Sequence, residues 1–215
     1  MPKGLVPLKG KPILEIIIDD IRSIGISDFI LVIGNKSEQI IDYFGNGEKF
    51  GIKIQYIKQD QLLGTAHALL QTESILSDDV FLLHLGDAIN PSALKINFQS
   101  MYDDDYEVSI LTSLISNSIN KSVGNIIIKN HFVTAISEKS SILNAEHYWA
   151  GVILFKNKKI FSKIKSMNIS KTGEFELTEA VGQLVSDNVL VRNYTCEKSI
   201  DAGTSEGLDE CSKYL

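Results

Sequence analysis

Apolar runs alternate with amphipathic segments through the first 90 residues, and this alternation constrains the fold more than any other feature of the sequence. Runs rich in β-branched residues predict strands at 28–34, 51–57 and 79–87. Apolar residues at helical spacing predict helices at 12–25, 37–44 and 64–76. Strands joined through helices pair in parallel, so this half predicts a mostly parallel sheet with helices on both faces. The first and third strands are continuous apolar runs, which predicts that they are buried.

The second half of the chain has a different texture, because strands follow one another with no long helix between residues 102 and 156. Strands are predicted at 106–115, 124–130, 132–139 and 148–156. The chain is completed by helices at 158–166 and 174–186, a strand at 189–195 and a helix at 205–214. No repeat or linker interrupts the sequence, so we expect a single mixed α/β domain over residues 1–215, with a small antiparallel extension.

Composition excludes several functional classes. A net charge of −6 argues against a protein that binds nucleic acid through a broad basic surface. Two cysteines, Cys196 and Cys211, do not make a disulfide framework. No apolar run approaches the roughly 20 residues that a membrane-spanning helix needs, and no signal peptide precedes the first predicted helix. We therefore expect a cytoplasmic protein that binds neither nucleic acid nor membrane.

Several segments carry groups suited to phosphates or to a nucleobase. The opening stretch MPKGLVPLKGKPILE places Lys3, Lys9 and Lys11 before a helix, where anions are attracted, although a solvated lysine cluster is the alternative. In KQDQLLGTAHAL, Gly64 and Thr65 turn into a helix whose first N–H groups can bond a ligand. The Gln59 amide both donates and accepts, so it can read a base edge.

Carboxylates form the second set of candidates. Asp87 and Asp201 each lie in a glycine-containing corner, and two carboxylates with phosphate oxygens are a usual Mg²⁺ site. This interpretation requires the fold to bring the two aspartates together, because Gly-Asp corners are also common turns. Glu138 and Lys139 could hold sugar hydroxyls and a phosphate, or be an exposed charged pair.

Taken in order, these segments resemble the sugar-phosphate nucleotidyltransferases, also called nucleotide-sugar pyrophosphorylases. The segments 2–7 and 10–15 are similar to that family's Pro-Lys-x-Leu-x-Pro and Gly-Lys-Pro-x-Leu signature. The later landmarks, in chain order, are IIDYFGNGEKFGIKIQY, LLGTAHAL, LGD, SEK, AGVILF, GEFELTEA and DAGT. Each motif is short, and the specificity of the resemblance comes from their order from residue 2 to the end of the chain.

The resemblance implies a GT-A-like, Rossmann-type sheet and a nucleotidyl transfer reaction. In this reaction a sugar 1-phosphate oxygen attacks the α-phosphorus of a nucleoside triphosphate, which gives a nucleotide-sugar and pyrophosphate without a covalent enzyme intermediate. Catalysis then consists of positioning and of charge neutralisation by Mg²⁺ and cationic side chains. The implied partners are the two small substrates, and homo-oligomerisation stays open.

The motifs also imply roles for individual residues of this sequence. The implied catalytic residues are Lys3, Asp87 and Asp201. The two aspartates would bind Mg²⁺, and the lysine would contact phosphates. The implied nucleotide-binding residues are Gln59, Gly64 and Thr65. The implied sugar-phosphate-binding residues are Gly124, Glu138 and Lys139.

The sequence also departs from the family pattern. A first strand and a Gly-x-Gly-Thr-Arg loop normally precede Pro-Lys, and residues 1–215 contain neither, so the chain is N-terminally incomplete relative to the family. Ser140, Trp149 and Ser199 replace the family's Pro, Asn and Trp at their motif positions. We therefore expect impaired turnover, and a sheet that is rearranged or completed by a partner strand.

Two other functions remain as alternatives. A non-catalytic regulatory relative would bind nucleotide or sugar without turnover. A GT-A glycosyltransferase would need an Asp-x-Asp metal motif at the end of a strand, whereas the pattern in YDDDY at 102–106 leads into one. The sequence identifies neither the nucleotide nor the sugar.

Overall fold

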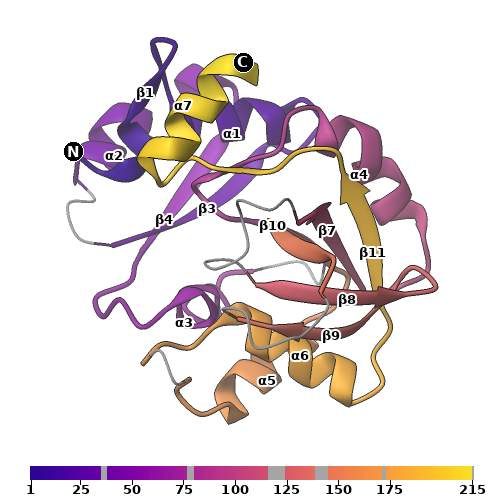
Figure 1. The fold of residues 1–215 in the computed structure, drawn as a ribbon. Helices are drawn as coiled ribbons and strands as arrows, with labels where there is room; N and C mark the ends of the chain where they lie inside the picture. Colours follow the sequence, from indigo (N-terminus) through magenta and orange to yellow (C-terminus); the bar gives the residue numbers. More distant parts are fainter. Residues whose placement is uncertain (35–37, 77–79, 116–123, 139–144, 171–172, 215) are drawn as a thin grey trace. The chain divides into compact units, whose positions relative to one another are not determined.

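The computed structural model describes residues 1–34, 38–76, 80–115, 124–138, 145–170 and 173–214 (Figure 1). The chain forms two compact units. The first unit comprises residues 1–62, 85–99 and 199–215, and the second comprises residues 63–84 and 100–198. Each unit consists of segments that are separated in the sequence. The predicted single-domain organisation over 1–215 stays a prediction.

The first unit contains short helices, a hairpin and a parallel strand pair. Its helical segments are η1 (Lys3–Leu5), α1 (Ile13–Arg22), α2 (Glu38–Phe44), η2 (Glu48–Phe50) and α7 (Ser205–Tyr214). Its strands are β1 (Pro7–Leu8), β2 (Lys11–Pro12), β3 (Asp28–Ile33), β4 (Lys53–Lys58), β6 (Ala88–Ile89) and β12 (Ile200–Asp201). Within this unit α7 packs beside β1 (Figure 1).

Helix α1 forms where the isoleucine spacing predicted it. Ile13, Ile17 and Ile21 recur at four-residue intervals and are all buried. Gly25 follows the helix with φ of +91°, a conformation that glycine adopts without a Cβ penalty, so the predicted stop is confirmed. Ile18 on the same helix packs into a core cluster with Phe44 of α2.

Strands β3 and β4 are parallel neighbours, with Asp28 opposite Lys53 and Ile33 opposite Lys58. Their positions confirm the predicted strands, but the predicted burial of β3 is wrong, because residues 29–32 are only half-buried. The reason is that β3 pairs with β4 alone among the described strands, so its second edge has no strand neighbour.

The second unit is built around a six-stranded sheet. Its strands are β5 (Phe81–His84), β7 (Val108–Leu114), β8 (Asn125–Lys129), β9 (Phe132–Ser137), β10 (His147–Phe155) and β11 (Val191–Cys196). Its helices are α3 (Thr65–Leu70), α5 (Lys159–Ser166) and α6 (Leu177–Ser186). Helix α6 lies against β9 and packs on α5 (Figure 1).

The predicted mixed sheet is confirmed, but the prediction that it is mostly parallel is wrong for this unit. The strand order is β5-β10-β7-β11-β9-β8, and β10 also pairs with β8, so five of the strands close into a ring. Only β7 and β11 run parallel within this sheet; its other pairings are antiparallel. The chain is therefore an α/β protein with a mixed sheet.

The ring closes because β10 bends in the middle. Its register with β7 shifts between Trp149 and Val152, and Gly151 within the shift has φ of +81°. Such a bulge turns a strand away from its original direction. The start of β10 therefore pairs with β8, with Tyr148 opposite Asn125, while the remainder continues along β7.

Helices α3 and α4 and strand β5 also differ from the sequence prediction. Helix α3 ends at Leu70, and turns rather than helix continue to residue 75. Helix α4 (Ala93–Asp103) was not predicted. Its apolar positions do not follow one clean stripe, because Leu94 and Met101 are buried while Ile96 is 72% exposed. Strand β5 is half-buried rather than buried, and pairs with β10 alone among the strands that the structure describes.

Candidate active site

Lys3, Asp87 and Asp201 meet at one corner of the first unit, around Gly203. A Cβ atom placed on Gly203 would lie 2.9 Å from Asp201 Oδ1, 2.9 Å from Asp87 Oδ2 and 3.4 Å from Lys3 Nζ. The fold therefore brings together three charged groups from the start, the middle and the end of the chain. We call this arrangement the Gly203 corner.

Backbone hydrogen bonds hold the two aspartates of this corner in place. Strand β12 pairs antiparallel with β6, which sets Asp201 opposite Ala88. The Ala202 N–H donates to the Asp87 carbonyl oxygen at 2.8 Å. The Gly203 N–H donates to Asp201 Oδ1 at 2.8 Å and so orients that carboxylate. The main chain thus orients the Asp201 carboxylate and fixes the backbone of Asp87, as a preorganised site requires.

Only one of the three N-terminal lysines reaches the corner. Lys3 begins η1, and its carbonyl oxygen accepts from the Val6 N–H at 3.0 Å, which fixes the turn. Lys11 instead bonds Asp19 on the surface of α1 at 2.7 Å, and this hydrogen bond raises the pKa of Lys11. Lys9 lies in the β1–β2 turn with φ of +49°. The solvated-lysine alternative therefore describes Lys11, and Lys3 remains the phosphate candidate.

The electrostatics of the corner favour a bound cation. Burial raises the pKa of the Asp87 carboxyl, the negative charge of Asp201 raises this pKa further, and Lys3 partly opposes the rise. Two carboxylates that repel each other gain from a shared divalent ion.

The residues at the corner suit magnesium better than a metal that needs a protein cage. In the described part of the chain, no group of three or more His, Cys, Asp or Glu side chains could hold a metal. Mg²⁺ takes one or two carboxylates and completes its shell with water and substrate phosphates, so Asp87 and Asp201 fit it.

Gln59 ends the parallel pair of the first unit. Its backbone N–H donates to the Ile33 carbonyl oxygen at 2.8 Å, which continues the β3–β4 ladder by one residue. The residue is buried, with 7% of its surface exposed. Its role at a nucleobase stays a prediction.

In the second unit, Gly64 and Thr65 contact the segment that leads into α6. Gly64 has φ of +99°, and a Cβ there would lie 2.7 Å from the Phe175 carbonyl oxygen and 2.9 Å from Glu174 Cβ. The Thr65 hydroxyl accepts a hydrogen bond from the Leu177 N–H at 3.0 Å, at the first residue of α6. The motifs LLGTAHAL and GEFELTEA therefore contact each other. This contact explains why glycine occupies position 64.

Gly124 and Glu138 also meet, against α6. A Cβ on Gly124 would lie 2.6 Å from Thr178 Cγ2 and 3.4 Å from Glu138 Oε2. The Thr178 hydroxyl donates to Glu138 Oε2 at 2.7 Å. Gly124 is buried, so close packing against Thr178 is sufficient to require glycine there. Lys139 lies outside the described residues, and the sugar-phosphate roles of all three stay predictions.

The sequence analysis missed two residues of these clusters. Thr178, which links Gly124 to Glu138, gave no signal, because a threonine in the first turn of a helix is common. Gly203 was visible only as part of DAGT, and the signal that could have found it is a glycine two residues after a candidate metal ligand.

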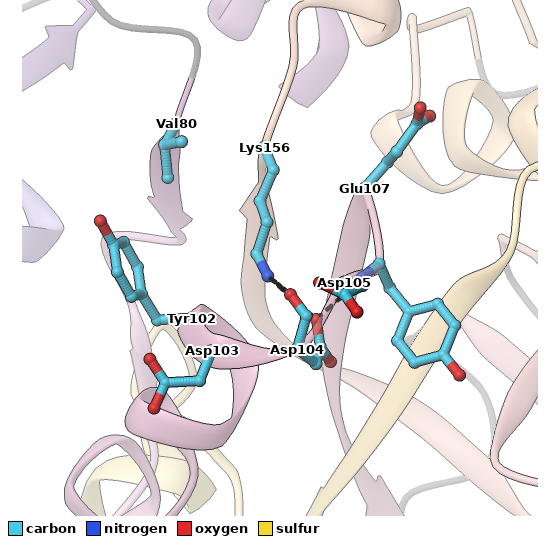
Figure 2. Close-up of a pocket in the computed structure, with 8 residues that line it drawn as sticks. Val80, Tyr102, Asp103, Asp104, Asp105, Glu107 and Lys156 are labelled. Carbon is cyan, nitrogen blue, oxygen red and sulfur yellow. Dashed lines mark hydrogen bonds and ion pairs between the residues drawn. The ribbon is translucent and has the colours of Figure 1, made fainter.

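A hollow lined by several acidic side chains lies in the second unit (Figure 2). It has a volume of about 430 Å³, and Figure 2 shows its lining, which includes Val80, Tyr102 and Asp105. Asp104 pairs with Lys156 at 3.0 Å, so part of its negative charge is compensated. None of the predicted site residues lines this hollow, and the YDDDY segment forms its wall without ending a strand.

Comparisons with known proteins give a consistent result. A model of the nucleotidyl transferase family matches residues 1–215. A low-salt glycan biosynthesis nucleotidyltransferase of Haloferax volcanii is 28% identical over 197 residues, which are 91% of this chain and 55% of that protein. A bifunctional protein GlmU of Methanococcus maripaludis is 33% identical over 187 residues, which are 86% of this chain and 42% of that protein. The chain thus spans about half the length of these relatives.

A solved structure extends the similarity to the fold. The crystal structure of a UDP-glucose pyrophosphorylase complexed with UDP-glucose superimposes with a TM-score of 0.86 at 19% identity. The match covers 99% of this chain and 89% of that one. In the described residues no helix has both the length and the apolar character needed to cross a membrane.

Proposed function

Because the chain belongs to the nucleotidyl transferase family, we propose that it transfers a nucleotidyl group from a nucleoside triphosphate to a sugar 1-phosphate. The products would be a nucleotide-sugar and pyrophosphate, formed on a GT-A-like fold by a cytoplasmic enzyme. The observation that carries the proposal is the convergence of Lys3, Asp87 and Asp201 at the Gly203 corner. This set of a cation and two carboxylates is what binding of a magnesium-bound triphosphate requires.

The residues of the corner have distinct roles in this proposal. Asp87 and Asp201 would hold Mg²⁺, which neutralises phosphate charge when bound. Lys3 would contact phosphate oxygens directly, since an ammonium group is a compact donor for them. The hydrogen bond from the Gly203 N–H keeps Asp201 oriented before any substrate arrives. The residues that we propose for nucleotide binding are Gln59, Gly64 and Thr65.

The sugar-phosphate end of the reaction is assigned to residues of the second unit. Glu138 would accept sugar hydroxyls, with Thr178 holding its Oε2 atom at 2.7 Å. Gly124 and Lys139 would complete the contacts to the sugar phosphate. The indole N–H of Trp149 donates to the Val152 carbonyl oxygen at 3.3 Å, so this N–H group is already hydrogen-bonded within the protein.

We expect residues 1–215 alone to turn over slowly. The family loop that carries Gly-x-Gly-Thr-Arg is not among these residues. Loss of a single transition-state donor typically costs about 10²- to 10³-fold in rate. Residues 1–215 assayed without such a loop should therefore be at least about 10²-fold slower than a relative that contains it.

The test is an assay of pyrophosphate release. The chain is incubated with Mg²⁺ and a panel that pairs UTP, dTTP, GTP, CTP or ATP with glucose, N-acetylglucosamine, mannose or heptose 1-phosphates. The proposal predicts slow release that requires both a particular triphosphate and a particular sugar phosphate. Binding of both ligands by calorimetry, with no release over background, would contradict it and favour a non-catalytic regulatory protein.

A further inference from the structure

The absence of a side chain at Gly203 has a specific consequence for the corner. We propose that Gly203 is a positioning residue, whose missing Cβ leaves the space in which the Asp87 and Asp201 carboxylates converge on one cation. This inference rests on the proposed function, because it concerns the same magnesium site. Because glycine has no side chain, Gly203 would act through the two aspartates and not by contacting substrate or metal itself.

The surroundings of the missing Cβ distinguish position 203 from an ordinary turn glycine. The nearest atoms to that point are Asp201 Oδ1 and Asp87 Oδ2, each at 2.9 Å, and Lys3 Nζ at 3.4 Å. All three are the charged ends of side chains. A methyl group there would be closer to both carboxylates than van der Waals contact allows, so at least one carboxylate would have to move.

The backbone at position 203 does not itself demand glycine. Its φ lies outside the positive range that favours glycine, so alanine is compatible with the main chain. The backbone conformation at position 203 therefore does not explain why this residue is glycine. The reason for glycine lies in the three charged groups around it.

Two other glycines of the first unit provide contrasts. At Gly86, one residue before Asp87, a Cβ would meet nothing within 4 Å. At Gly207, in α7, a Cβ would lie 1.8 Å from the Asp201 carbonyl oxygen, which is backbone. Position 86 therefore has room for a methyl group, a methyl group at position 207 would collide with backbone, and a methyl group at position 203 would displace the carboxylates.

Hydrogen bonds restrain the Asp201 carboxylate and the backbone of Asp87. Asp201 Oδ1 is held by the Gly203 N–H at 2.8 Å, and the Asp87 main chain is held by the Ala202 N–H at 2.8 Å. A methyl group at position 203 would push each oxygen away from the point where they converge. The expected result is a weaker cation site in a folded protein.

The test measures Mn²⁺, as a spectroscopic substitute for Mg²⁺, by electron paramagnetic resonance of the free ion. Wild type is compared with Gly203→Ala, with Gly86→Ala as the matched control and with Gly207→Ala as the control for loss of fold. We expect Gly203→Ala to weaken Mn²⁺ binding by about 10- to 100-fold, the range seen when groups that orient metal ligands are changed. Gly86→Ala should bind as wild type does.

Thermal unfolding of each variant accompanies the titration. Gly203→Ala and Gly86→Ala should melt near the wild-type temperature, and Gly207→Ala well below it. The inference is overturned if Gly203→Ala binds Mn²⁺ as tightly as wild type, if Gly86→Ala is weakened equally, or if Gly203→Ala melts as low as Gly207→Ala. A wild-type chain that binds no Mn²⁺ would instead overturn the metal site of the proposed function, and the inference with it.

Discussion

At the scale of single residues, burial determines the chemistry of the two thiols. Burial raises the pKa of Cys196 to about 11, and burial together with the nearby charge of Glu210 raises that of Cys211 to about 11. A thiol in an unfolded chain has a pKa near 8.5. Both cysteines are therefore unreactive thiols in the folded protein at neutral pH.

These pKa values predict how stability depends on pH. Below about pH 8 both thiols are neutral in the folded and the unfolded chain, so they add no pH dependence. Between about pH 8.5 and 11 the unfolded chain releases thiol protons that the folded chain retains, so the free energy of unfolding falls as pH rises.

Urea denaturation at pH 7.5 and pH 10 measures this effect. The difference in unfolding free energy between the two pH values should be larger for wild type than for the Cys196→Ala, Cys211→Ala double variant, which lacks both thiols. An equal difference in the two proteins would show that the cysteines do not titrate in this way.

At the scale of elements, the contact between the entry to α3 and the entry to α6 should be important for stability. Gly64 combines a positive φ with a close approach to the Phe175 carbonyl oxygen, which is backbone and cannot swing aside. The adjacent Thr65 hydroxyl accepts from the first N–H of α6. A change at Gly64 therefore strains two helix starts at once.

The prediction is that Gly64→Ala destabilises the chain more than a glycine change that alters φ preference alone. Gly10, in the β1–β2 turn, has φ of +84° and nothing within 4 Å of its Cβ position, so it is the matched control. Placing alanine at a positive φ costs about 1–3 kcal/mol, and Gly64, with ψ of 178°, lies in a part of this range that essentially only glycine occupies. Gly64→Ala should exceed the measured cost of Gly10→Ala in chemical denaturation. Equal costs would mean that the contact with Phe175 adds nothing.

Elements with a clear period were predictable from the sequence. Helix α1 and strand β4 follow directly from isoleucine spacing and from apolar alternation. The closed ring was not predictable, because it depends on a bulge between Trp149 and Val152 that brings β10 to β8. Nothing local in the sequence marks which partner a bent strand will choose. Parallel pairing was overestimated for the same reason.

At the scale of the whole molecule, part of the candidate site could be predicted from the order of the motifs along the chain. Lys3, Asp87 and Asp201 were identified from three distant motifs, and their meeting point became visible only through the pairing of β6 with β12. Gly203 could not be assigned a role from sequence, because its importance depends on its distances to the charged groups around it in the folded chain. Gly64 and Gly124 were expected at ligands, and the structure also gives each a packing reason.

The central claim is that the Gly203 corner supports nucleotidyl transfer by residues 1–215. Its most direct test is pyrophosphorolysis, measured as transfer of radiolabelled pyrophosphate from solution into nucleoside triphosphate in the presence of the matching nucleotide-sugar. Asp87→Asn should lower the wild-type rate by at least about 10²-fold, because it removes a carboxylate that would hold the Mg²⁺ ion, and that ion neutralises transition-state charge. Asp105→Asn, on the acidic hollow, should leave the rate unchanged. Equal rates for wild type and Asp87→Asn would contradict the account.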